Sequence, residues 1–176
     1  MPRMKSSSKL TSLTFTRRVA VATAATFLAL GLSAQPIKHA DKNFIENAAK
    51  CGMEELAISR VVVERTTNPQ VKSFAQMVVD DHSSANDALM SIASAKGVKL
   101  PAKDMDDAKK WSKKSAKGLD EDYVEKMVSA HKDAVKLFEK EADKGEDAET
   151  KAFARATLPK LQHHLEMAMD LKKTVK

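Results

Sequence analysis

Apolar residues recur at steps of three and four along four long segments of the chain. In the clearest segment they are Val71, Phe74, Ala75, Val78, Ala85, Leu89 and Ile92. This spacing places side chains on one face of an α-helix, whereas a strand would show strict alternation. The pattern predicts four amphipathic helices, over Asp41–Thr66, Pro69–Lys96, Glu121–Lys144 and Ala148–Lys172.

The links between these segments predict how the helices are connected. Asn68 and Pro69 supply an N-cap and a first helical position, so the first two helices form an antiparallel hairpin. The next link, Gly97–Leu119, contains a lysine-rich short helix at Asp104–Lys117, anchored by Trp111. Such a link can return along the bundle and set the third helix parallel to the second, although a short exposed excursion also fits. The predicted fold is all-α, a ferritin-like antiparallel four-helix bundle with a long connection between helices two and three.

Capping residues set the predicted helix and domain boundaries. Asp41, Asp120 and Asp147 precede the apolar faces of the first, third and fourth helices and are the expected N-caps. The bundle domain is expected to span 41–173, and residues 35–40 before it are expected to form a flexible tail.

The first 34 residues differ from the rest of the chain. Residues 1–18 carry five basic residues and no acidic one, and an uncharged run of Ala, Leu, Val and Thr follows at Val19–Leu32. With small residues at 33–34, this pattern predicts a signal peptide over 1–34, an uncleaved anchor being the alternative. Arg17-Arg18 also suggests twin-arginine export, so that route and the general secretory route both stay open.

The charge and the cysteine content limit the partners and the covalent bonds that we expect for this chain. The chain has 30 Lys and Arg against 24 Asp and Glu, but five basic residues lie in 1–34, which leaves 25 against 24, or +1. We therefore expect no nucleic-acid partner, and no transmembrane segment after signal cleavage. Cys51 is the single cysteine, so no intrachain disulfide forms, and its place on the apolar face predicts a small core thiol.

Each long helix carries one ionisable residue on its apolar face, namely Glu55, His82, His131 and His164. At about 1.5 Å of rise per residue, Glu55 and His82 differ in depth by about 5 Å, and His131 and His164 by about 6 Å. All four residues are therefore expected near the middle of the bundle. Asp81, next to His82, is the candidate for an extra or outer ligand.

Two interpretations of these residues stay open. Three imidazoles and one carboxylate form a ligand set for a single iron, manganese, zinc or copper ion. Dinuclear carboxylate bundles use Glu-x-x-His motifs, whereas Val79, Val128 and Leu161 lie three residues before the histidines, which disfavours di-iron chemistry. Alternatively, the carboxylate and the imidazoles form a buried hydrogen-bond network that fixes the register of the helices.

Several segments resemble a family of exported bacterial proteins, the domain of unknown function 4142. They are Asp41-x-x-Phe44, Gly52-x-x-Glu55-Leu56, Asn68-Pro69-x-Val71-Lys72-x-Phe74-Ala75-x-x-Val78-x-x-Asp81-His82-Ser83, Asp120-x-x-Tyr123, His131, Phe138-x-x-Glu141-Ala142 and Leu158-Pro159-x-Leu161-x-x-His164-Leu165. The resemblance covers about 41–172 and implies a ferritin-like bundle outside the cytoplasm. The family is often labelled as outer-membrane proteins, and the resemblance implies no reaction. Cys51 lies outside the family pattern.

The predicted function is that of an exported, periplasmic bundle that binds a metal ion, either for metal binding itself or in the envelope response to metal or oxidative stress. The alternative is a non-catalytic envelope stress or interaction protein with a structural Glu/His network. A third hypothesis is an oxidoreductase with mononuclear iron or manganese. Peripheral outer-membrane association, protein partners and self-association stay open.

Overall fold

The computed structural model describes residues 36–102, 106–116 and 118–175. Its helices are α1 (His39–Arg65), α2 (Pro69–Ala95), α3 (Asp106–Ser112), α4 (Leu119–Lys144) and α5 (Ala148–Thr174). No strand occurs within these ranges. None of the helices in the described ranges is long and apolar enough to cross a membrane. The predicted signal peptide, 1–34, lies outside the described residues.

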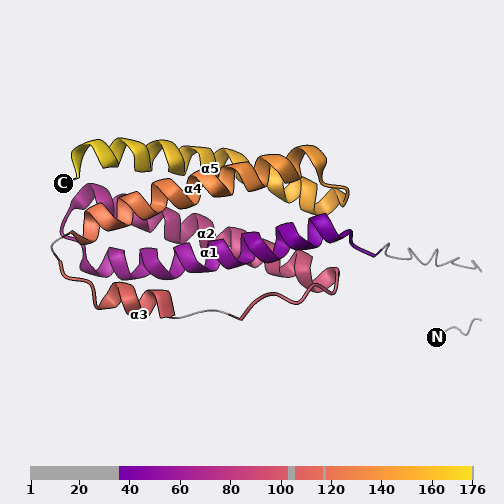
Figure 1. Cartoon of the computed structure of the whole chain (residues 1–176), viewed down its shortest axis with the longest axis horizontal. Helices are drawn as coiled ribbons and strands as arrows, with labels where there is room; N and C mark the ends of the chain where they lie inside the picture. Colours follow the sequence, from indigo (N-terminus) through magenta and orange to yellow (C-terminus); the bar gives the residue numbers. More distant parts are fainter. Residues whose placement is uncertain (1–35, 103–105, 117, 176) are drawn as a thin grey trace, which may run out of the picture. The chain divides into compact units, whose positions relative to one another are not determined.

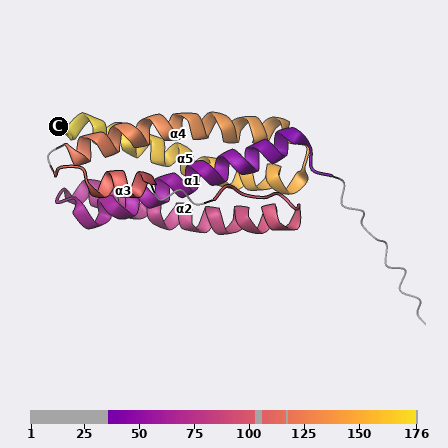
Figure 2. The ribbon, with the colours of Figure 1, turned by 60° about the horizontal axis from the view of Figure 1, so that its bottom comes forward.

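The four long helices form two hairpins that pack into one bundle (Figure 1). Helix α1 packs on α2, and α4 packs on α5, while α1 also contacts α4 and α2 contacts α5. The connection after α2 runs back along the bundle to α3, as Figures 1 and 2 both show, so α4 runs parallel to α2. This confirms the predicted four-helix bundle with a long connection that contains a short helix, and not the short exposed excursion.

The short helix α3 is held against the end of α1. Trp111 is buried and packs edge-on against Tyr123, with ring centroids 6.2 Å apart. The Arg65 guanidinium donates hydrogen bonds to the carbonyl oxygens of Trp111 and Lys114, at 2.7 and 2.5 Å. Trp111 is therefore the anchor that the sequence predicts, and it fixes the point from which the chain enters α4.

Two of the predicted N-caps are correct and two are wrong. Asn68 accepts hydrogen bonds from backbone N–H groups in the first turn of α2, and Asp147 does the same for α5. Helix α4 instead begins after Gly118, in a left-handed conformation (φ +83°), so Asp120 lies inside its first turn. Helix α1 begins at His39, in the segment expected to be a flexible tail, and this places Asp41 within the helix.

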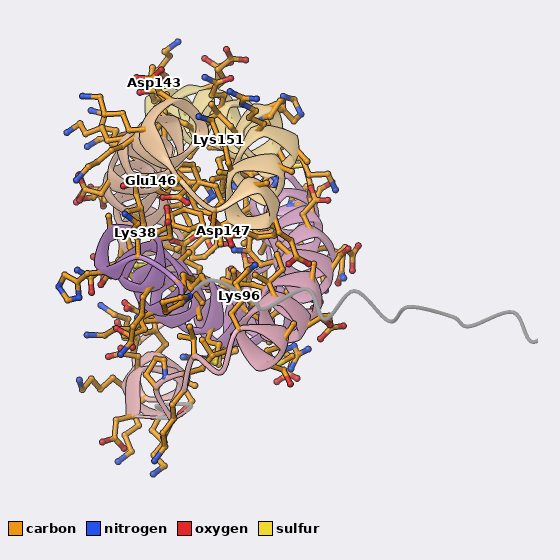
Figure 3. All side chains as sticks on the ribbon, turned by 90° about the vertical axis from the view of Figure 1, so that its right-hand side faces the viewer. Lys38, Lys96, Asp143, Glu146, Asp147 and Lys151 are labelled. Carbon is orange, nitrogen blue, oxygen red and sulfur yellow. The ribbon has the colours of Figure 1, made fainter. Side chains whose placement is uncertain are left out.

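Asp41 caps a different part of the chain from the one predicted. Its carboxylate is buried and accepts hydrogen bonds from the backbone N–H groups of Glu146 and Asp147, at 3.0 and 3.2 Å. At the same end, Lys96 pairs with Asp147 and Glu149, at 2.7 and 3.1 Å, and Figure 3 shows Lys96 and Asp147 facing each other. Polar contacts therefore tie the start of α1 and the end of α2 to the turn between α4 and α5.

Two apolar clusters lie on either side of the middle of the bundle. One contains Ile58, Val62, Phe74, Val78, Met127, Val128 and Ala168, and the other contains Phe44, Ala49, Leu89, Phe138, Ala154 and Leu161. On every long helix, the ionisable residue predicted from the sequence falls between members of the two clusters. The candidate site is therefore positioned by an apolar layer above it and another below it.

Candidate metal centre

The structure brings the four predicted residues together from four helices. Glu55 lies on α1, His82 on α2, His131 on α4 and His164 on α5, and all four side chains are buried. Their exposed fractions are 2%, 7%, 0% and 1%, respectively. All four side chains therefore lie on the buried faces of their helices, as the periodicity of the sequence predicts.

Nitrogen and oxygen atoms of these side chains converge on a small volume. Glu55 Oε2 lies 3.4 Å from His82 Nε2 and 3.6 Å from His131 Nε2. His131 Nε2 lies 3.2 Å from His164 Nδ1. One ring nitrogen of each of the three histidines lies within 4.8 Å of those of the other two. Within the described part of the chain, these histidines form the group of His, Cys, Asp and Glu side chains with metal-binding geometry.

A backbone carbonyl fixes the tautomer of His131. Its Nδ1 lies 3.0 Å from the Met127 oxygen, one turn earlier in α4. Since a carbonyl oxygen only accepts, Nδ1 carries the hydrogen and donates it. The Nε2 atom of the neutral ring therefore presents a lone pair toward His164 and Glu55.

Asp81 fixes the tautomer of His164 in the same way. Its Oδ2 atom lies 3.0 Å from His164 Nε2, and its Oδ1 atom accepts a hydrogen bond of 2.5 Å from Lys160. Partial burial raises the pKa of Asp81, but the hydrogen bonds from Lys160 and His164 outweigh it, and the net pKa is lowered. The carboxylate therefore accepts the Nε2 hydrogen of His164, and Nδ1 of the neutral ring presents its lone pair to His131.

With these tautomers, several buried polar atoms of the cluster have no hydrogen-bond partner. Two lone pairs face each other across the 3.2 Å between His131 Nε2 and His164 Nδ1. Glu55 Oε2 and His82 Nε2 are buried and have no hydrogen-bond partner among the described residues. A buried polar atom without a partner costs about 1–3 kcal/mol, so four converging atoms without one call for an explanation.

Burial keeps the imidazoles neutral. Burial, followed by the charges of His131 and His164, lowers the pKa of His82 to about 3. Burial and the neighbouring His164 lower the pKa of His131 to about 4. Burial raises the pKa of Glu55 to about 8, against the opposing charge of Lys126. Near neutral pH the cluster therefore presents neutral imidazoles, the form that binds metal ions, together with a carboxyl group that an ion would deprotonate.

Two residues beside the cluster differ from what the sequence predicted: Asn86 was not identified, and Cys51 was expected in the core. Asn86 lies one turn after His82, is buried, and lines a cavity of about 40 Å³ together with His82 and Glu55. Its position on the apolar face of α2 was the signal that could have identified it. Cys51 was predicted as a core thiol but is exposed, because the side of α1 that faces the core passes through Gly52 and Glu55 instead.

Comparisons with known proteins agree with this fold. A crystal structure of a DUF305 fragment from Deinococcus radiodurans superposes with a TM-score of 0.69, covering 80% of this chain and 100% of that chain. The two sequences are 12% identical, so this similarity shows the fold alone. A comparison with curated protein sequences gave no match. The sequence pattern of the domain of unknown function DUF4142 matches residues 29–171, so the chain belongs to the DUF4142 family.

Proposed function

We propose that this protein binds one divalent transition-metal ion in the middle of its bundle. The ligands would be Glu55 Oε2, His82 Nε2, His131 Nε2 and His164 Nδ1, with Asp81 orienting His164. The observation that carries the proposal is the convergence of lone pairs on His131 and His164, whose ring hydrogens are both committed to acceptors outside the cluster. A cation is the species that such an arrangement stabilises.

The separations between the donor atoms support the same conclusion. Two ligands that are each about 2.0–2.1 Å from one ion at a tetrahedral angle are roughly 3.3–3.4 Å apart. Three of the six separations among the proposed donor atoms are 3.2, 3.4 and 3.6 Å, which is close to this value, and one ring nitrogen of each histidine lies within 4.8 Å of those of the other two. Three imidazoles and one carboxylate suit iron, manganese, zinc or copper.

A purely structural Glu/His network explains the contacts less well. Hydrogen bonds between oxygen and nitrogen are about 2.7–3.2 Å long, whereas Glu55 lies 3.4 Å from His82 and 3.6 Å from His131. A network would also leave the lone pairs of His131 Nε2 and His164 Nδ1 facing each other unless one of the two rings took a second proton, and burial lowers the pKa of both rings. The metal hypothesis requires neither shorter distances to Glu55 nor a second proton on an imidazole ring.

The signal-peptide pattern at 1–34 supports a role outside the cytoplasm. We propose that the protein binds metal in the periplasm, in metal handling or in the response to metal or oxidative stress. No substrate enters this proposal, because the observations concern ligands for an ion and not groups that would act on a second molecule.

Metal analysis of the purified protein tests the proposal directly. The protein would be purified without chelator, and iron, manganese, zinc and copper would be measured before and after incubation with each ion. We expect about one ion per chain, and an added stability of about 2.7 kcal/mol when free metal is at 100 times its Kd. Failure to bind any of the four ions would contradict the metal site and favour the structural network.

Substituting Asp81 by Asn tests the outer part of the same site. An amide accepts a weaker hydrogen bond from His164 Nε2 and can itself donate, which leaves the His164 tautomer unspecified. We expect metal affinity to fall by about 10–100-fold with the stoichiometry unchanged, measured by competition with a chelator of known affinity. Asp80→Asn, which changes the adjacent exposed carboxylate, is the matched control and should bind as the wild type does. Equal affinities for the two variants would rule out the role assigned to Asp81.

A further inference from the structure

A cavity lies directly beside the four candidate ligands. Its volume is about 40 Å³, which is room for about three water-sized molecules at 10–15 Å³ each. Glu55, His82 and His164 line it, and so do Leu89 and Phe138 of the neighbouring apolar cluster. The cavity therefore extends from the candidate ligands toward that cluster, where no candidate ligand is present.

Asn86 supplies an unused hydrogen-bond donor to this cavity. It lies one turn after His82 on α2, and its side chain is 9% exposed. Its Nδ2 atom is buried and has no hydrogen-bond partner within the described residues. A buried amide that lines a cavity in this way is satisfied when a molecule in the cavity accepts its hydrogen.

Gly52 leaves the space that the Asn86 amide occupies. A Cβ atom at residue 52 would lie 2.4 Å from Asn86 Oδ1, which is too close, so the amide would have to shift. Glycine inside a helix costs about 1 kcal/mol relative to alanine, so its presence one turn before Glu55 needs a structural reason. The reason visible here is that it lets the Asn86 amide lie beside the candidate ligands.

The charges around the cavity favour an anion. A divalent ion with three neutral imidazoles and the Glu55 carboxylate retains a net charge of about +1, which an anion neutralises. Lys160 and Asp81 also line the cavity, but they form an ion pair with each other and so add no net charge. The positive charge that an anion would meet is therefore that of the ion itself.

We propose that this cavity binds a small anion of about three non-hydrogen atoms or fewer, which adds to the metal ion as a fifth ligand and accepts a hydrogen bond from Asn86 Nδ2. This inference rests on the proposed metal site and specifies the class of exogenous ligand that the site takes. The step is a ligand addition, in which the ion would expand from four ligands to five and no electron is transferred.

Azide binding to the cobalt(II)-loaded protein tests the inference. Azide has three atoms and changes the visible absorption of cobalt(II) when it coordinates, while cobalt content is measured on the same samples. We expect saturable azide binding to the wild type and at least tenfold weaker binding to Asn86→Leu, which has the same number and branching of side-chain heavy atoms but no donor. Gly52→Ala should weaken azide binding to a similar extent, because the new Cβ displaces the amide.

The controls separate this inference from the metal proposal. Asp87→Asn changes the exposed residue next to Asn86 and should leave azide affinity unchanged. Cobalt-loaded wild type that binds no azide, or binds it as tightly in Asn86→Leu, would overturn the anion site and leave the metal site standing. Absence of cobalt would overturn both. If Gly52→Ala does not fold, Asn86→Leu decides the question alone.

Discussion

His164→Ala is expected to lose tight metal binding while the bundle keeps its helical structure. His164 is 1% exposed and supplies one of the four converging donor atoms, so its removal leaves an incomplete ligand set. We expect the Kd for the metal to rise by at least about 100-fold, beyond the 10–100-fold typical of outer-shell residues. At a metal concentration of 100 times the wild-type Kd, stabilisation by metal would fall from about 2.7 to about 0.4 kcal/mol.

The adjacent histidine supplies the control for this prediction. His163 is exposed, so His163→Ala changes the same residue type at the neighbouring position and should bind metal as the wild type does. Thermal unfolding and circular dichroism, with and without metal, would be measured for both variants. If His164→Ala retained the stoichiometry and affinity of the wild type, His164 would not be a ligand, and the site would have to be redrawn.

The ionisable groups of the site are expected to make the metal-free protein most stable against unfolding near pH 6.5. Unfolding restores the ordinary pKa values of about 6.5 for His82 and His131 and about 4.5 for Glu55, from folded values of about 3, 4 and 8. Between pH 6.5 and 4.5 the unfolded chain therefore binds two more protons on His82 and His131 and one fewer on Glu55, and the lowered pKa of His164 acts in the same direction as those of the other histidines. Stability falls as pH falls, by on the order of 1 kcal/mol per pH unit or more.

Above pH 6.5 the sign reverses. The histidines are then neutral in both states, whereas Glu55 remains protonated in the folded protein and is ionised in the unfolded chain. Stability should therefore fall as pH rises toward 8, by up to about 2 kcal/mol in total. Urea unfolding of metal-free protein across this range measures both arms.

Substitution of Glu55 isolates the alkaline arm. Glu55→Gln has no group to ionise, so its stability should change less between pH 6.5 and 8 than that of the wild type. Glu64→Gln removes an exposed carboxylate elsewhere on α1, which is not among the charges that shift the Glu55 pKa, and should keep the wild-type pH profile. An identical alkaline slope in Glu55→Gln and the wild type would show that Glu55 is already ionised in the folded protein.

The structure revises two local predictions, and both depend on how the helices pack against one another. Asp41 has the sequence of an N-cap, but its carboxylate bonds to backbone N–H groups at 146 and 147, more than 100 residues away in the chain. Cys51 falls near the edge of the apolar face of α1 and proves to be exposed. The rotation of each helix against its neighbours decides which edge positions are buried and which contacts they make. The periodicity within one helix carries no information about that rotation.

Local patterns in the sequence are enough to predict the four amphipathic helices, the hairpin of the first two, and the buried faces on which Glu55, His82, His131 and His164 lie. These follow from local rules, because helical periodicity and the rise per residue hold within each helix regardless of its neighbours. The tertiary structure alone decided which atoms face one another: the Met127 carbonyl and Asp81 fix two imidazole tautomers, and so direct the lone pairs inward. It also decided that Gly52 of α1 makes room for Asn86 of α2. Such contacts depend on distances of a few tenths of an ångström between helices, which only the packing of the whole bundle specifies.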